Sequence, residues 1–235
     1  EISTGDSHNA DEKFDGIDID SAGGVSVTNY GVISGGRHGI TTDLGATLVN
    51  YGQITGRNGS GFGSDGDGTV INHGTITGAY SGLQANGDGD GVDIDNIAHI
   101  ENYGTIQGVG AGGVDKGGFA NGSEGIALGG GYILNAKNAL ISGADSAILV
   151  DDGSGNSGLA ATTLENFGTI QGLNGFGVKF VGEFDDNVVN GGTISGSNGL
   201  ALDLGGGNDS LTLRNGSRFV GLVDGGSGYD RVVMD

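Results

Sequence analysis

One nine-residue pattern decides the fold of this chain: apolar, any, Asn, aromatic, Gly, any, Ile, any, Gly. It occurs as VTNYGVISG (27–35), LVNYGQITG (48–56), VINHGTITG (70–78), IENYGTIQG (100–108), LENFGTIQG (164–172) and VVNGGTISG (188–196). Two looser copies are ILNAKNALISG (133–143) and LRNGSRFVG (213–221). The repeated Asn therefore falls at positions 29, 50, 72, 102, 135, 166, 190 and 215. So many copies predict a repeat architecture in which each copy lies on its predecessor.

A second pattern, Gly–apolar–any–apolar–Asp or Gly, falls between successive copies. It is found in GIDID (16–20), GITTD (39–43), GFGSD (61–65), GVDID (91–95), GIALG (125–129), AILVD (147–151), GVKFV (177–181) and GLALD (199–203). Alternating apolar residues are typical of short strands with one buried face. Gly at the strand ends fits corners that need positive φ or close backbone approach. At least two strands per coil then predict a β-solenoid of about eight coils, since stacking buries the inner faces.

Like residues are expected to line up along the axis of such a solenoid. One expected inward column is Ile33, Ile54, Ile76, Ile106, Ile141, Ile170 and Ile194. A second is Val25, Ile40, Val92, Ile126, Ile148, Val178 and Leu200. A ladder of side-chain amides at a corner is expected from Asn29, Asn50, Asn72, Asn102, Asn166 and Asn190. The rings that follow this Asn are expected to stack: Tyr30, Tyr51, His73, Tyr103 and Phe167.

Composition narrows the class of protein and its partners. The 235 residues include 55 Gly but no Pro and no Cys, and the formal net charge is −20. Glycine without Pro or strict every-third spacing excludes collagen, and the regular apolar pattern argues against disorder. The lack of Cys excludes disulfides and thiolate metal sites, and it suits export through an oxidising compartment. The negative charge disfavours nucleic acid and anionic lipid as partners and leaves cations or neutral sugars.

Over essentially its whole length the chain resembles the passenger domains of autotransporters, the type V secreted proteins of Gram-negative bacteria. Repeats of the form N-Y/F-G-x-I-x-G are common in those right-handed β-helices, and residues 202–235 are similar to the stretch before their translocating barrel. A filamentous haemagglutinin or another β-helical exoprotein agrees less well. The resemblance implies an all-β, right-handed parallel β-helix as a single domain over 1–235. It also implies export to the cell surface or the extracellular space, with membrane contact only through a C-terminal barrel.

The coils differ in length, and this points to a candidate functional face. Successive Asn are 21 residues apart from Asn29 to Asn50 but 33 apart from Asn102 to Asn135. The extra residues lie in 79–99, 109–132 and 144–163, and stacking is expected to place them beside each other. Insertions on one side of a repeat protein often form its binding face. Residues 79–163 are therefore the predicted functional face.

This face is rich in carboxylates, which allow two interpretations. If the protein is an enzyme, paired carboxylates suited to glycosidic cleavage are Asp90, Asp93, Glu124 and Asp152. Candidate ligand-binding residues are Asp88, Asp95, Lys116, Asp151, Arg37 and His38. The competing interpretation assigns one column to corners, where each carboxylate bonds the amides of its own turn. That column is Asp20, Asp43, Asp65, Asp95, Asp151 and Asp203.

A weak calcium signal lies near the C-terminus. The stretch GGSGYDRVV (225–233) matches the nonapeptide of calcium-binding β-rolls, which makes Asp209 and Asp230 candidate ligands. These two residues are 21 positions apart, whereas a β-roll turn takes about 18. A calcium site also needs six or more oxygen ligands, so an ordinary corner in each coil is the alternative. No other cofactor is predicted.

Three functions stay open. The first is an adhesin or binding module that contacts a glycan, a host surface or another copy of itself. The second is an extracellular polysaccharide hydrolase or lyase, and the third is a structural stalk without a ligand. Two catalytic candidates within about 10 Å over a groove, with Lys116 nearby, would favour the enzyme. Carboxylates pointing apart into solvent would favour the binding module.

Overall fold

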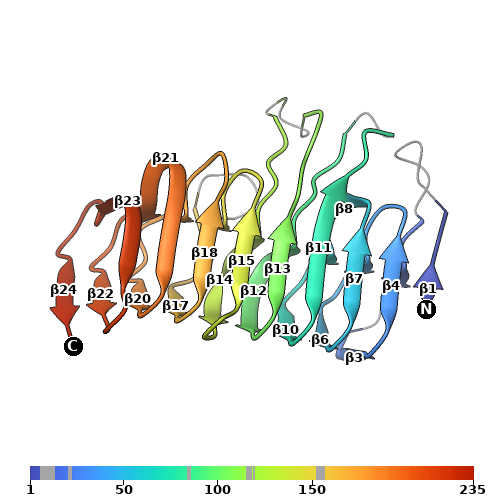
Figure 1. Cartoon of the computed structure of the whole chain (residues 1–235), viewed down its shortest axis with the longest axis horizontal. Helices are drawn as coiled ribbons and strands as arrows, with labels where there is room; N and C mark the ends of the chain where they lie inside the picture. The colour runs from blue at the N-terminus through green and yellow to red at the C-terminus, as the bar shows by residue number, and fades with distance from the viewer. Residues whose placement is uncertain (6–13, 21–22, 84–85, 115–117, 119, 152–156) are drawn as a thin grey trace.

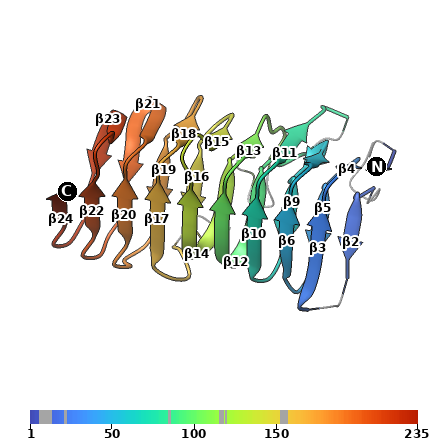
Figure 2. The same cartoon turned by 60° about the horizontal axis from the view of Figure 1, so that its bottom comes forward.

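The computed structural model describes residues 1–5, 14–20, 23–83, 86–114, 118, 120–151 and 157–235. Within them the chain forms 24 strands and no helix, so none of the described segments is a helix that could span a membrane. The strands of successive coils pair in parallel and form a right-handed β-helix. Figures 1 and 2 show the coils stacked along one axis, with the two termini at opposite ends of the rod. The predicted fold class is therefore confirmed.

Each regular coil contributes one strand to each of three faces, A, B and C. Face A contains β1 (Ile2–Ser3), β4 (Val32–Gly35), β7 (Gln53–Gly56), β11 (Thr75–Tyr80), β13 (Thr105–Gly108), β15 (Leu140–Gly143), β18 (Thr169–Gly172) and the first parts of β21 (Thr193–Asp203) and β23 (Arg218–Asp224). Face B contains β2 (Ile17–Ile19), β5 (Ile40–Thr42), β9 (Phe62–Ser64), the first parts of β12 (Val92–Asn102) and β14 (Ile126–Asn135), β16 (Ile148–Val150), β19 (Val178–Phe180) and the ends of β21 and β23.

Face C completes the coil. It contains β3 (Val25–Asn29), β6 (Ala46–Asn50), β10 (Gly68–Asn72), the second parts of β12 and β14, β17 (Thr162–Asn166), β20 (Asn187–Asn190), β22 (Ser210–Leu213) and β24 (Arg231–Met234). The short β8 (Asn58–Gly59) pairs antiparallel with the end of β11. The chain runs from face B through face C to face A, so the Asn–aromatic–Gly triplet is the corner between faces C and A.

The predicted Ile column lines the interior. Its seven members, from Ile33 to Ile194, pair coil by coil along face A, and none is more than 4% exposed. Burial of an Ile side chain contributes about 1.5–3 kcal/mol relative to exposure, so this column is a major source of stability.

The second predicted column is correct in its middle and wrong at both ends. Ile17, not Val25, pairs with Ile40, because Val25 begins face C and pairs with Ala46. Leu202, not Leu200, pairs with Val178, because the coil keeps its register from the pairing of Gly172 with Gly196 onward and Gly177 lies opposite Ala201, not opposite Gly199. Phe62 fills the coil between Ile40 and Val92.

The amide ladder is confirmed, and it includes Asn135. Each Asn Nδ2 donates to Oδ1 of the Asn in the next coil at 2.8–3.0 Å, from Asn29 to Asn190. The ladder ends there, because Leu213 pairs with Asn190 and the amide of Asn190 donates to Ser217 Oγ instead. Asn215 lies in an exposed turn, so its predicted place in the repeat is wrong. The cause is two extra residues in this last corner.

The ring stack is confirmed for four members. Neighbouring rings in the series Tyr30, Tyr51, His73 and Tyr103 have centroids 4.8–5.0 Å apart and planes within 8°. Ala136 follows in the next coil, so Phe167 lies beyond the stack. The Gly after each ring is required by close approach: a Cβ on Gly52, Gly74 or Gly104 would clash with a backbone carbonyl of the preceding coil.

Candidate functional site

The longer loops between faces A and B extend beyond the ends of β11 and β13 (Figure 1). Two of them pair directly, since Gly87 and Gly112 exchange backbone hydrogen bonds of 2.8 and 2.9 Å. The Tyr80 ring packs over both glycines, where any Cβ would clash with it. The third insertion differs: Asp151 and residues 157–161 lie between β16 and β17, at the corner between faces B and C.

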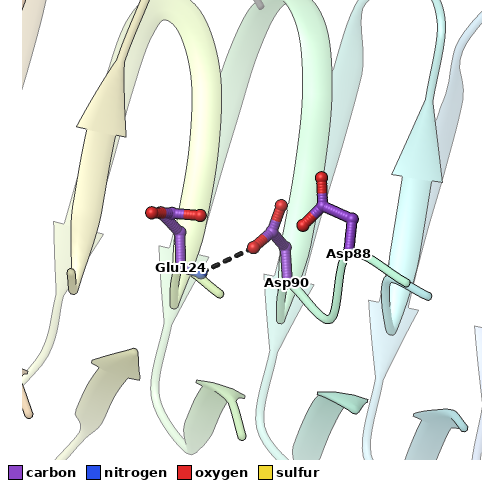
Figure 3. Close-up of side chains that lie close together, drawn as sticks. All are labelled: Asp88, Asp90 and Glu124. Carbon is purple, nitrogen blue, oxygen red and sulfur yellow. Dashed lines mark hydrogen bonds between the residues drawn. The ribbon is translucent and has the colours of Figure 1, made fainter. Parts of the chain in front are cut away.

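Three carboxylates converge at the base of these loops: Asp88, Asp90 and Glu124 (Figure 3). One oxygen from each lies within 4.8 Å of the others. Asp90 is only 2% exposed, and its Oδ1 accepts a 2.6 Å hydrogen bond from the backbone N–H of Glu124. Asp88 is exposed and Glu124 is half-buried. The structure therefore brings together two of the catalytic candidates with one of the binding candidates.

Burial makes this cluster retain protons. It raises the pKa of Asp90 well above its usual range, and the charges of Asp88, Glu124 and Asp93 add to the effect. Burial likewise raises the pKa of Asp93, which lies on face B beside the cluster. The pKa of Glu124 is raised to about 7, chiefly by burial and against a hydrogen bond with Asp90. At neutral pH these groups share protons instead of all carrying charge.

The carboxyls lie closer together than a glycosidase requires. One oxygen from each of Asp88, Asp90 and Glu124 lies within 4.8 Å of the others, whereas paired glycosidase carboxyls are about 5–9.5 Å apart. Asp152 and Lys116, which the enzyme interpretation also uses, lie outside the described residues. Asp90 and Glu124 are thus close together, as the enzyme interpretation requires. Their separation does not reach the spacing that would place a sugar or a water between them.

A structural role explains Asp90 and its equivalents in other coils. In three coils, the side chain two positions before the face B strand accepts a hydrogen bond from the backbone of the next coil. Asp15 Oδ1 accepts from His38 N–H, and His38 Nδ1 accepts from Ser60 N–H, each at 2.9 Å. Arg37 forms a two-pronged pair with Asp15 at 3.1 and 2.9 Å. The candidates Arg37 and His38 are thus engaged in holding a corner.

The remaining acidic candidates do not belong to the cluster of Asp88, Asp90 and Glu124. Asp95 is exposed and Asp151 is half-buried. Asp203 pairs with Lys179, which puts it in the column of Asp93 and not that of Asp95, so its predicted position is wrong by two residues. Its Oδ1 does accept from Gly205 N–H at 3.1 Å, which is the turn bond that the corner interpretation predicts.

Asp209 and Asp230 belong to an inward column at the start of face C. Asp186, Asp209 and Asp230 each accept a hydrogen bond from the equivalent backbone N–H of the preceding coil, at 2.5, 2.8 and 3.1 Å. Asp209 is 1% exposed, and its Oδ2 has no hydrogen-bond partner. Burial raises the pKa of Asp186 to about 7 and that of Asp209 to about 6. Calcium at Asp209 and Asp230 stays a prediction.

Sequence reasoning missed Asp186 and a groove. The signal for Asp186 was present in the related runs DNVVN (186–190), DSLTL (209–213) and DRVVM (230–234). The groove is open, measures about 510 Å³ and follows the corner between faces B and C. It is lined by Gly24, Leu44, Gly45, Ala46, Thr47, Asp67, Gly68, Thr69, Ile97, Ala98, His99, Gly131 and Tyr132. Leu44 and Ile97 are 59% and 38% exposed.

The aromatic wall of the groove is held in place by hydrogen bonds. The rings of His99 and Tyr132 stack with centroids 4.9 Å apart. Glu101 accepts from the Tyr103 hydroxyl at 2.7 Å and lies 3.0 Å from His99 Nε2. These two bonds lower the pKa of Glu101, and the one from Tyr103 raises the pKa of that hydroxyl. The His99 ring thus contacts both Glu101 and the stacked Tyr132 ring, and these contacts favour one orientation of the wall.

No protein-family model matches this chain, and no curated protein or solved structure is significantly similar to it.

Proposed function

We propose that this β-helix is a secreted or surface-displayed binding module, an adhesin of the autotransporter passenger type. The observation that carries the proposal is the groove between faces B and C, with its exposed Leu44 and Ile97 and its ordered aromatic wall. A stalk has no need for apolar side chains held open to water at a concave site, whereas a binding site does.

The autotransporter assignment and the location rest on the sequence. The N-Y/F-G-x-I-x-G repeats support the resemblance, and the absence of Cys suits export. The net charge of −20 argues against nucleic acid as a partner. A glycan, a host surface and another copy of the chain are the partners to be tested.

The enzyme alternative has less support. Its carboxylate oxygens lie within 4.8 Å of one another, and Asp90 accepts a hydrogen bond from the backbone of the next coil. A stalk remains the third alternative, and it requires that the groove bind nothing.

A blocked groove tests the proposal. Thr69 points outward within the groove, next to His99, so Thr69→Tyr would fill the groove without entering the core. Thr163 occupies the same outward column beyond Tyr132 and does not line the groove, so Thr163→Tyr is the matched control. Both variants and the parent chain are applied to a glycan array and to host cells, and self-association is followed by sedimentation.

The expected result is binding that Thr69→Tyr abolishes and Thr163→Tyr leaves intact. A parallel assay for new reducing ends, run on the same polysaccharides, is expected to detect no product. Product from any polysaccharide would replace the binding module by the enzyme. Absence of binding to glycans, cells and itself would leave only the stalk.

A further inference from the structure

We propose that the groove between faces B and C is a site for an uncharged oligosaccharide, with His99 and Tyr132 as the platform for a sugar ring. This inference rests on the proposed binding function and names the chemical class of its ligand. It depends on the shape of the floor, the chemistry of the walls and the local charge.

The shape of the groove comes from the outward column of face C. The small residues Ala46 and Ala98 belong to the neighbouring inward column, where they are 7% and 3% exposed and pack in the core. The outward residues Thr47, Thr69, His99 and Tyr132 pair coil by coil. The groove runs over this outward column, from the short threonines to the two rings, with Leu44 and Ile97 at the adjoining corner. Its volume of about 510 Å³ lies within the usual range for small-molecule sites.

The walls combine the two kinds of surface that a sugar presents. Leu44 and Ile97 offer aliphatic contacts for ring C–H groups, and Tyr132 with His99 offers aromatic ones. Hydroxyl and carboxylate groups of Thr47, Thr69 and Asp67 lie in the same lining. The hydroxyls both donate and accept hydrogen bonds and the carboxylate accepts them, as sugar hydroxyls require.

Local charge selects against acidic sugars. Asp67 is the carboxylate of the lining, and no Lys or Arg is found among the described residues that form it. Glu101 stands directly behind His99, and the whole chain has a charge of −20. A uronic acid or a sulfated sugar would be repelled. The same field would attract a cationic sugar, but the lining offers it one carboxylate, Asp67, among apolar and hydroxyl groups, so an uncharged ring matches the walls better.

An extended peptide is a poorer fit. A peptide that adds to a sheet needs a free strand edge. The strands beneath the groove, β6, β10 and β12, are each paired on both sides. The floor therefore offers no row of unpaired backbone groups, and recognition depends on side chains.

Calorimetry on the full chain tests the ligand class. The probes are length-matched oligomers of neutral hexose, N-acetylhexosamine, hexuronic acid and free hexosamine. We expect a neutral oligomer to bind at least about tenfold more tightly than either charged one. Equal or tighter binding of a charged oligomer would overturn the inference.

Variants of Tyr132 test the platform. Tyr132→Ala is expected to weaken binding of the neutral oligomer by about tenfold, while Tyr132→Phe, which keeps the ring, stays within about threefold. Tyr30→Ala, at the exposed end of the other ring stack, is the control and is expected to change nothing. If Tyr132→Ala fails to fold, Leu44→Ser replaces it, because Leu44 is 59% exposed and packs against little.

Unchanged affinity in Tyr132→Ala and in Leu44→Ser would overturn the platform. The two proposals fail in different ways. Binding to cells or to a second copy that Thr69→Tyr abolishes, without any oligosaccharide binding, would end the glycan inference and keep the binding module. Loss of every binding signal would end both.

Discussion

Two corners of this β-helix use side chains that bond to the neighbouring coil, but with different chemistry. At the corner between faces C and A, seven Asn side chains form an unbroken ladder. At the start of face C, three Asp side chains form the column Asp186, Asp209 and Asp230. An amide both donates and accepts, so identical copies satisfy each other indefinitely. A carboxylate only accepts, so a column of them depends on backbone N–H groups and on retained protons.

The largest expected effect comes from placing a carboxylate in the amide ladder. Asn102 Nδ2 donates to Asn135 Oδ1 at 3.0 Å and to Leu140 O at 2.9 Å. Asn102→Asp turns both contacts into oxygen–oxygen repulsion at a fully buried site, and we expect a loss of about 3–5 kcal/mol in the free energy of unfolding. Urea unfolding measures it. Asn215→Asp, in the exposed turn outside the ladder, is the control; an equal loss there would refute the distinction.

The second effect is a dependence of stability on pH. The folded pKa values of Glu124 and Asp186 are about 7, above their ordinary values of 4.5 and 3.8. The folded state therefore binds protons that the unfolded state has released, and stability falls as pH rises from about 4 to about 7. We expect a combined loss of about 2 kcal/mol, reduced because Glu124 is partly exposed. Thermal unfolding between pH 4 and pH 8 measures it. Stability that rises steadily over this range would contradict the assignment.

A third test removes the ionisation from one member of the carboxyl column. Asp209→Asn keeps the acceptor for Asp186 N–H and cannot become charged. The folded pKa of Asp209 is about 6, so we expect the variant to be more stable than the parent by about 1 kcal/mol at pH 8 and nearly equal at pH 4. Asp224→Asn, an exposed turn carboxylate bonded to Gly226 N–H, is the control. A gain in the free energy of unfolding that is equal at pH 4 and pH 8 would mean that ionisation of Asp209 is not its cause.

The smallest expected effect concerns the exposed ring stack. Tyr51 lies between Tyr30 and His73 but is 47% exposed. Tyr51→Ala is therefore expected to cost only about 0.5–1 kcal/mol in urea unfolding, much less than the change at Asn102. Tyr229→Ala, at a 90% exposed ring, provides the baseline. A loss as large as that of Asn102→Asp would make the rings, and not the amides, the main support of this corner.

The errors of the sequence prediction share one physical cause. Each coil of a solenoid pairs residue by residue with the coil before it. An irregular corner or an irregular glycine in one coil therefore assigns residues to the wrong column when the repeats are simply aligned. Gly199 lies two positions earlier in its coil than Gly177, so aligning these glycines misplaced both Leu200 and Asp203, and the longer last corner misplaced Asn215. Where the corners keep equal length, as from Ile33 to Ile106, alignment and structure agree.

The candidate site was likewise predicted only in part. The sequence showed that the loops are acidic, and two of the predicted carboxylates, Asp90 and Glu124, do lie close together. The groove was not readable, because its lining comes from separated segments, such as those around Leu44, Asp67 and Ile97. Its floor is the outward column Thr47, Thr69, His99 and Tyr132, and these residues come from four separate coils and share no local sequence pattern.

The amino-acid sequence by itself determined the repeat, the inward Ile and Asn columns and the acidic, cysteine-free composition, because each depends on residue type and spacing along the chain. Only the tertiary structure decided which carboxyls lose water, which corner is hollow and where the Asp column begins. Those properties depend on what each coil places over its neighbour, and that contact joins residues 21 or more positions apart.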